Sequence, residues 1–374
     1  MVFLLNLLVV NLCDKIESKN RNPATMSYKI KLTCLQCSLF FFSLLFCRPL
    51  LAQADFSAVD QLFKQNQKNL GNDFVALVWK DGKVIYQKQG GTEFTPKTPA
   101  PIAAAGNWLT AALVMAMVDE GKLSLDDKVS QYIPLFAKYM KTYITIRHCL
   151  THTTGIQADD GIKKLLVNIK YESLEEEVNT YASKRNIVTN PGTEFFYSNV
   201  GPNIAARVLE VITKKSFDRL ISEKILRPCK MRGTSFSNED GGAVNPAGGA
   251  RSTANDYISF LSMLLNKGMS GDKRVLSEKS VAELESLQFG ELPVKYAPKT
   301  LQGVHFGLGS YIVDTNAAGP SVFSCPNLLG TTPFLDKCRN YAGILIVLKP
   351  EEEKKSLYPS FKNLLDGAVG ACSQ

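Results

Sequence analysis

The chain has 374 residues, of which 45% are hydrophobic, 21% charged and 9% aromatic, and its formal net charge is +8. These fractions are close to globular averages, and they exclude extended disorder and a protein made mainly of membrane spans. Lysine and arginine form no stripe interleaved with aromatic residues, so we expect no nucleic-acid partner. With only three histidines in the chain we also expect no metal and no other cofactor.

Residues 1–54 have the features of a presequence that ends in a secretory signal. Met26 is the better initiator; it opens a short basic stretch, and an apolar run follows over residues 38–47. Ala52-Gln53-Ala54 then supplies the small residues that a signal peptidase reads. We therefore expect an exported protein, periplasmic or extracellular, with no membrane partner beyond this segment. An uncleaved N-terminal anchor is the alternative.

After the presequence, the pattern predicts a helix and a hairpin. The segment 56–70 is helix-like. Two apolar runs, 74–79 and 84–86, then flank Asp81-Gly82, a dipeptide typical of tight hairpin turns. We expect these two runs to pair as antiparallel strands.

The middle of the chain is mainly helical, and its end returns to a strand. Apolar residues at helical spacing predict helices over 108–120, 201–213 and 256–265. An apolar strand over 341–348 and an amphipathic helix over 357–369 follow. This order favours one sheet built from both termini, with a helical region inserted into it.

Nine cysteines are present, and four of them lie in the presequence. The remaining five are Cys149, Cys229, Cys325, Cys338 and Cys372. Because five is odd, at least one thiol lacks an intramolecular partner even in an oxidising compartment. One candidate bridge is Cys325–Cys338.

Several ordered segments carry a family resemblance: 102–111 (IAAAGNWLTA), 118–127 (VDEGKLSLDD), 146–155 (IRHCLTHTTG), 191–193 (PGT) with 197–199 (YSN), and 248–253 (GGARST). This set resembles the serine β-lactamase and penicillin-binding-protein-like superfamily. The relevant branch contains class C β-lactamases, D-alanyl-D-alanine carboxypeptidases and esterases. The resemblance spans about residues 56–370.

The resemblance implies an α/β (α+β) fold of the β-lactamase/transpeptidase type. In such a fold an antiparallel sheet formed by both termini is flanked by helices, and a mainly helical subdomain is inserted. We expect a single domain over 55–374. Its sheet subdomain would take about 55–125 and 285–374, and its helical subdomain about 126–284.

The chemistry of this superfamily rests on a Ser-x-x-Lys motif, in which nucleophile and ammonium stand one helical turn apart. Matching the flanking residues places Ala104 at the serine position and Asn107 at the lysine position. A methyl group cannot attack a carbonyl, and a neutral amide cannot supply positive charge. These positions are therefore vestigial, and no Ser or Lys occurs from Pro99 to Gly121 to replace them.

The second motif of the resemblance, Tyr-x-Asn, survives as Tyr197-Ser198-Asn199. It implies that Tyr197 and Asn199 line a ligand site; a buried tyrosine and a helix N-cap are the structural alternative. Without the motif lysine we expect Tyr197 to keep an ordinary high pKa and to stay protonated at neutral pH. Tyr197 would then donate a hydrogen bond to a ligand but would not act as a general base.

The third motif, a strand with Ser-Pro-Gly in a related branch, becomes Cys325-Pro326-Asn327. Cys325 would stand at the site wall, and the Asn327 side chain would crowd a place where glycine lets substrate approach the strand. His152 is a candidate general base. In this superfamily, however, the turn that carries it packs under the site, so we expect a structural role for His152.

These replacements predict a catalytically inactive relative that binds a peptidoglycan-derived or other acyl ligand. One alternative is an active serine hydrolase with a relocated nucleophile, Ser198 or Cys325. The other alternative is a structural scaffold whose cleft has collapsed. The sequence does not decide the oligomeric state.

Overall fold

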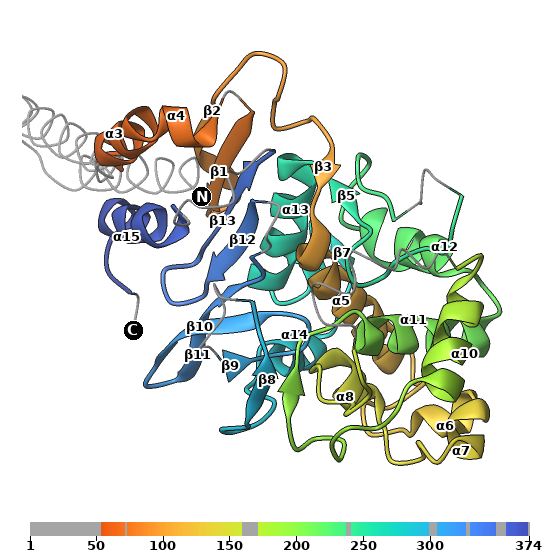
Figure 1. Ribbon diagram of the computed structural model, residues 1–374. Helices are drawn as coiled ribbons and strands as arrows, with labels where there is room; N and C mark the ends of the chain where they lie inside the picture. Colours follow the sequence, from red (N-terminus) through yellow and green to blue (C-terminus); the bar gives the residue numbers. More distant parts are fainter. Residues whose placement is uncertain are drawn as a thin grey trace, which may run out of the picture. The chain divides into compact units, whose positions relative to one another are not determined.

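A seven-stranded antiparallel sheet, in the order β2-β1-β13-β12-β11-β10-β9, is the centre of the fold (Figure 1). The computed structural model describes residues 54–71, 73–158, 171–236, 241–298, 305–326, 330–348 and 357–372. The presequence before residue 54 lies outside this range. The strands of the sheet are β1 (Phe74–Lys80), β2 (Lys83–Gln89), β9 (His305–Phe306), β10 (Tyr311–Asn316), β11 (Gly319–Ser324), β12 (Thr331–Asp336) and β13 (Tyr341–Val347).

The sheet joins the two ends of the domain, as predicted. Strand β1 pairs along its whole length with β13, with Phe74 opposite Val347 and Lys80 opposite Tyr341. The β1–β2 hairpin turns at Asp81 and Gly82, whose φ angles of 48° and 85° are the left-handed values that this dipeptide accommodates. The mixed fold with an antiparallel sheet and flanking helices is therefore confirmed.

Helices account for most of the remaining elements. They are α3 (Ser57–Gln65), α4 (Gln67–Leu70), α5 (Gly106–Asp119), α6 (Val129–Tyr132), α7 (Leu135–Lys138), α8 (Ile146–Leu150), α10 (Leu174–Lys184), α11 (Val200–Thr213), α12 (Phe217–Ile221), α13 (Ala254–Leu265), α14 (Glu278–Leu284) and α15 (Tyr358–Val369). Two short turns are η1 (Ala103–Ala105) and η2 (Ser222–Leu226). Every predicted helix is present, although the first is split into α3 and α4.

Short strands pair outside the main sheet. Strand β3 (Ala100–Pro101) pairs with β5 (Arg251–Ser252), β4 (Phe195–Phe196) with β8 (Val294–Tyr296), and β6 (Met269–Ser270) with β7 (Lys273–Arg274). The β4–β8 pair is parallel and lies beside the candidate site described below. In the described residues no helix is long and apolar enough to cross a membrane.

Alternating side chains of the strands give the sheet two apolar faces. On one face Phe74, Ala76 and Val78 of β1 pack with α3 and α15. On the other face Val75 and Leu77 join a larger core that contains α5, α11 and α13. Because successive strand residues point to opposite faces, one strand serves both cores. The larger core holds α5, the helix that positions the site.

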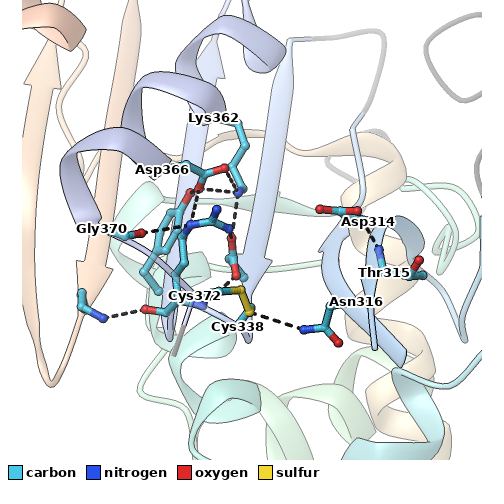
Figure 2. A network of polar contacts seen from close by, with 12 residues as sticks. Asp314, Thr315, Asn316, Cys338, Lys362, Asp366, Gly370 and Cys372 are labelled. Atoms are coloured by element: carbon cyan, nitrogen blue, oxygen red, sulfur yellow. Dashed lines mark hydrogen bonds and ion pairs between the residues drawn. A yellow bond between two sulfur atoms is a disulfide. The ribbon is translucent and has the colours of Figure 1, made fainter. Parts of the chain in front are cut away.

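A disulfide joins Cys338 to Cys372, with 5.0 Å between the two Cα atoms (Figure 2). The candidate bridge Cys325–Cys338 is therefore wrong. Cys338 lies in the β12–β13 turn, whereas Cys325 follows β11 and is buried against Ala104 and Gly309. Cys149, Cys229 and Cys325 are free and buried.

Polar contacts attach α15 to the sheet next to this disulfide. Lys362 Nζ donates to Asp366 at 2.6 Å and to the buried Asp336 at 2.8 Å (Figure 2). Burial alone would raise the pKa of Asp336, but the bonds from Lys362 and Arg339 lower it below its usual value. The C-terminal helix is thus held by a covalent bond and by buried ion pairs together.

Candidate functional site

A strained turn carries Ala104 and Asn107, the two positions that the sequence predicts for the motif, to the start of α5. Ala103 has a φ of 39°, a left-handed value that a residue with a Cβ rarely adopts. Ala104 follows in η1 and is partly exposed. Asn107 lies in the first turn of α5, one turn further on, and is only 3% exposed. The predicted spacing of one turn between the two positions is present.

The amide of Asn107, the residue at the predicted lysine position, contacts Tyr197. Its Nδ2 donates to the hydroxyl of Tyr197 at 3.0 Å. Its Oδ1 is buried and accepts no hydrogen bond from the described residues. The structure therefore brings Asn107 and Tyr197 together, across 90 positions of sequence.

Tyr197 is held in a ring of aromatic side chains. It packs against Tyr311 and His152, with ring centroids 6.3 Å and 4.5 Å away. Burial raises the pKa of the Tyr197 phenol well above its usual value, and the bond from Asn107 opposes this only in part. The pKa is higher than the ordinary value that the sequence predicted, and the phenol stays protonated at neutral pH.

Cys325 closes the other side of the site. It follows β11 and is 1% exposed, and its Sγ lies within hydrogen-bonding distance of two carbonyl oxygens, those of Ala104 (3.1 Å) and Gly309 (3.5 Å). Burial raises the pKa of its thiol, so the nucleophilic thiolate is disfavoured. The predicted crowding residue Asn327 lies outside the described residues.

Gly309 allows the strand side of the site to press against α5. Its φ is 72°, and a Cβ there would stand 2.6 Å from the backbone oxygen of Asn107 and 2.7 Å from Ala111. Only glycine fits such an approach. Sequence reasoning missed this contact and the Cys325–Ala104 bond, because neither has a local signal in the chain.

Asn199 and Ser198 lie where the chain enters α11. Asn199 occupies the N-cap position, but its side chain makes no capping hydrogen bond, so the structural alternative for Asn199 is not supported. The backbone N–H of Ser198 donates to Nδ1 of His152 at 3.4 Å. The lone pair with which this imidazole could act as a base toward the Ser198 hydroxyl is thereby occupied.

His152 is a buried, neutral packing residue. It is 2% exposed and its ring contacts Phe195, Tyr197 and Phe306. Burial lowers the pKa of His152 to about 3. Since Nδ1 accepts a bond, the proton of the neutral ring is assigned to Nε2, which has no partner among the described residues.

The polar partners that the Asn107 and Cys325 side chains contact are a hydroxyl and two backbone carbonyls, all uncharged groups. In the described part of the chain no lysine or arginine forms a hydrogen bond or ion pair with Ala104, Asn107, Tyr197 or Cys325. Among the described residues, no cluster of three or more His, Cys, Asp or Glu side chains is positioned to hold a metal ion. The Asn107 amide and the Tyr197 hydroxyl can exchange hydrogen bonds with a ligand.

Comparison with known proteins agrees with the fold. The sequence model of the family described as beta-lactamase matches residues 59–355. The putative beta-lactamase of Bacteroides dorei DSM 17855 superposes with a TM-score of 0.76 at 29% identity, covering 84% of this chain and 99% of that one. The octameric penicillin-binding protein homologue from Pyrococcus abyssi gives 0.67 at 19% identity, covering 83% and 76%, and this likeness shows the fold alone.

A curated relative matches only part of the chain. Protein flp of Staphylococcus aureus (strain MW2) is 28% identical over 170 residues, which are 43% of this chain and 34% of that protein. The chain therefore spans about a third of the length of that relative.

Proposed function

The chain belongs to the beta-lactamase family, and on that premise we propose that it is a member without acyl-transfer chemistry, which binds a peptidoglycan-derived or other acyl ligand. The observation that carries this proposal is the pair of residues Ala104 and Asn107 at the start of α5. A methyl group stands at Ala104, and a neutral amide at Asn107 donates to Tyr197. An acyl-transfer site needs an attacking atom and a group that takes its proton.

The tyrosine alone does not restore the missing base. A phenol whose pKa is raised by burial holds its proton at neutral pH, and the cation that would lower this pKa is replaced by an amide. Ala104 and Tyr197 are both partly exposed and can therefore still contact a ligand. Binding without turnover is therefore the function that these residues support best.

Export is part of the proposal. Residues 1–54 have the order of a basic stretch, an apolar run and a small-residue cleavage site. A disulfide between Cys338 and Cys372 fits an oxidising compartment, where such bonds form and persist. Both observations favour a protein that functions outside the cytoplasm.

Covalent labelling tests the inactivity. The purified protein is incubated with a fluorophosphonate probe and with penicillin, digested and mapped by mass spectrometry. We expect no adduct at any residue. An adduct on Ser198 or Cys325 would contradict the proposal and establish the relocated nucleophile instead, although the raised thiol pKa of Cys325 does not favour that outcome.

Thermal shift tests the binding. The melting temperature is measured with and without muropeptides, and with a β-lactam as a second acyl ligand. A saturable rise is expected, because a ligand that binds only the folded state stabilises it by mass action. No shift with either ligand would favour a scaffold with a closed cleft.

A further inference from the structure

One exposed loop brings together Met140, the most exposed large apolar side chain among the described residues, with tyrosines and lysines. The loop follows α7 and consists of residues 139–143. Met140 is 88% exposed, Tyr143 72% and Tyr139 40%. Figure 1 shows α6 and α7 side by side at the periphery of the helical region, and α7 also packs against α10. We name Lys128, Lys138, Tyr139, Met140 and Tyr143 the α7 loop patch.

Lysine ammonium groups lie against the tyrosine rings of this patch. Lys128 Nζ is 5.9 Å from the ring centroid of Tyr143, and Lys138 Nζ is 5.8 Å from that of Tyr139. These are cation–π distances, and they hold positive charge beside the apolar surface. No aspartate or glutamate occurs between residues 128 and 158. The two carboxylates that directly precede Lys128 are bonded to other groups, Asp126 to Arg147 and Asp127 to the Tyr132 hydroxyl.

The loop is fixed in this shape by a buried lysine. Lys141 is 6% exposed, and its Nζ donates to the carbonyl oxygen of Ala182 in the last turn of α10 at 2.5 Å. Met140 itself has a φ of 57°, a left-handed value at which a side chain is strained. The side chain of Met140 therefore adds no buried apolar surface to the folded core, although the loop that carries it is anchored and its backbone is strained.

We propose that the α7 loop patch is a docking surface for an anionic lipid bilayer. Tyrosine rings prefer the interface between water and lipid, and lysines at its edge are attracted to anionic headgroups. The apolar thioether of Met140 enters the layer below the headgroups, where it leaves water. A soluble polyanion would satisfy the lysines but would leave Met140 exposed, and this favours the bilayer. The sequence alone predicted no membrane partner beyond the presequence; the geometry of this loop is the reason to add one.

Vesicle co-sedimentation of the full chain tests the proposal with two variants and two controls. The vesicles contain phosphatidylcholine with phosphatidylglycerol, or phosphatidylcholine alone. Lys128→Gln/Lys138→Gln removes two charges from the patch, and Lys273→Gln/Lys279→Gln removes two exposed charges elsewhere. Met140→Asn removes the apolar group with a residue that tolerates the left-handed φ, and Val294→Thr changes another exposed apolar residue (59%). All proteins carry the same presequence, so the differences between them report the patch.

We expect the wild-type chain to partition to the anionic vesicles more than to the neutral ones. The patch lysine variant should lose about tenfold in partitioning and Met140→Asn about threefold, while both controls bind like the wild type. Circular dichroism melting checks that every variant is folded. Equal binding of all five proteins would overturn the proposal. A loss in the lysine variant with none in Met140→Asn would also overturn it, in favour of a soluble polyanion.

Discussion

At the scale of single residues, the site could be predicted in part because its flanking residues survive. The residues that flank Ala104, Asn107 and Tyr197 were sufficient to predict the motif positions from the sequence. The thiol of Cys325 could not be placed on the Ala104 carbonyl, because the two residues are 221 positions apart and meet only in the folded chain. Close packing of Gly309 on α5 is likewise a tertiary contact without a local pattern.

His152 gives a residue-scale prediction about pH. Its pKa is about 3 in the fold and about 6.5 in the unfolded chain, so the unfolded state binds more protons between these values. The stability that its neutral form contributes is fully present above pH 6.5 and is lost as the pH falls toward 3. Between pH 6.5 and pH 5 we expect this group to lower the free energy of unfolding by about 2 kcal/mol.

Urea unfolding of the wild type and His152→Asn at several pH values measures this contribution. Asparagine does not titrate in this range, tolerates the left-handed φ of 55° at this position, and can accept the Ser198 N–H bond. The variant should lack the loss of stability that His152 causes in the wild type. An identical pH slope in both proteins would show that His152 is not buried in its neutral form.

At the scale of elements, local signals predicted the helices and the first hairpin, and tertiary contacts determined the rest. The Asp81-Gly82 turn and the apolar spacing of α5, α11 and α13 are properties of short segments. The break between α3 and α4 was missed because the side chain of Asn66 donates to the Leu62 carbonyl, a local bond that competes with helix continuation. The partner of Cys338 was missed because it depends on how α15 packs.

The disulfide of α15 gives an element-scale prediction. Replacing both cysteines, Cys338→Ala and Cys372→Ala, frees a loop of 34 positions in the unfolded chain. We expect the free energy of unfolding to fall by about 3 kcal/mol, because the bridge restricts the unfolded ensemble. Denaturant unfolding of the variant, and of the wild type in reductant, should give the same loss. Unchanged stability in both samples would contradict the observed pairing.

At the scale of the whole molecule, the order of the predicted elements along the chain was sufficient to predict the architecture. Strands near both ends with helices between them led to a sheet built from both termini, and β1 pairs with β13 in this way. The order of the remaining strands could not be derived, since β9, β10 and β11 are short or irregular segments without strong alternation.

The presequence gives a prediction for the whole molecule. The cleavage motif Ala52-Gln53-Ala54 ends where the unit Asp55–Gln374 begins. If the protein is expressed in a secreting host, we expect the mature chain to start at Asp55. N-terminal sequencing and the intact mass of the secreted product measure this. A product that retains residues 26–54 would indicate the uncleaved anchor.

We propose that acyl transfer is absent because the attacking oxygen and the neighbouring ammonium are both missing. The most direct measurement is nitrophenyl-ester hydrolysis by the wild type, Ala104→Ser and Ala104→Ser/Asn107→Lys. We predict a rate at background for the first two and a gain of at least about 100-fold for the double variant, which regains the nucleophile together with a proton acceptor. Equal rates for the single and double variants, or turnover by the wild type, would contradict the claim.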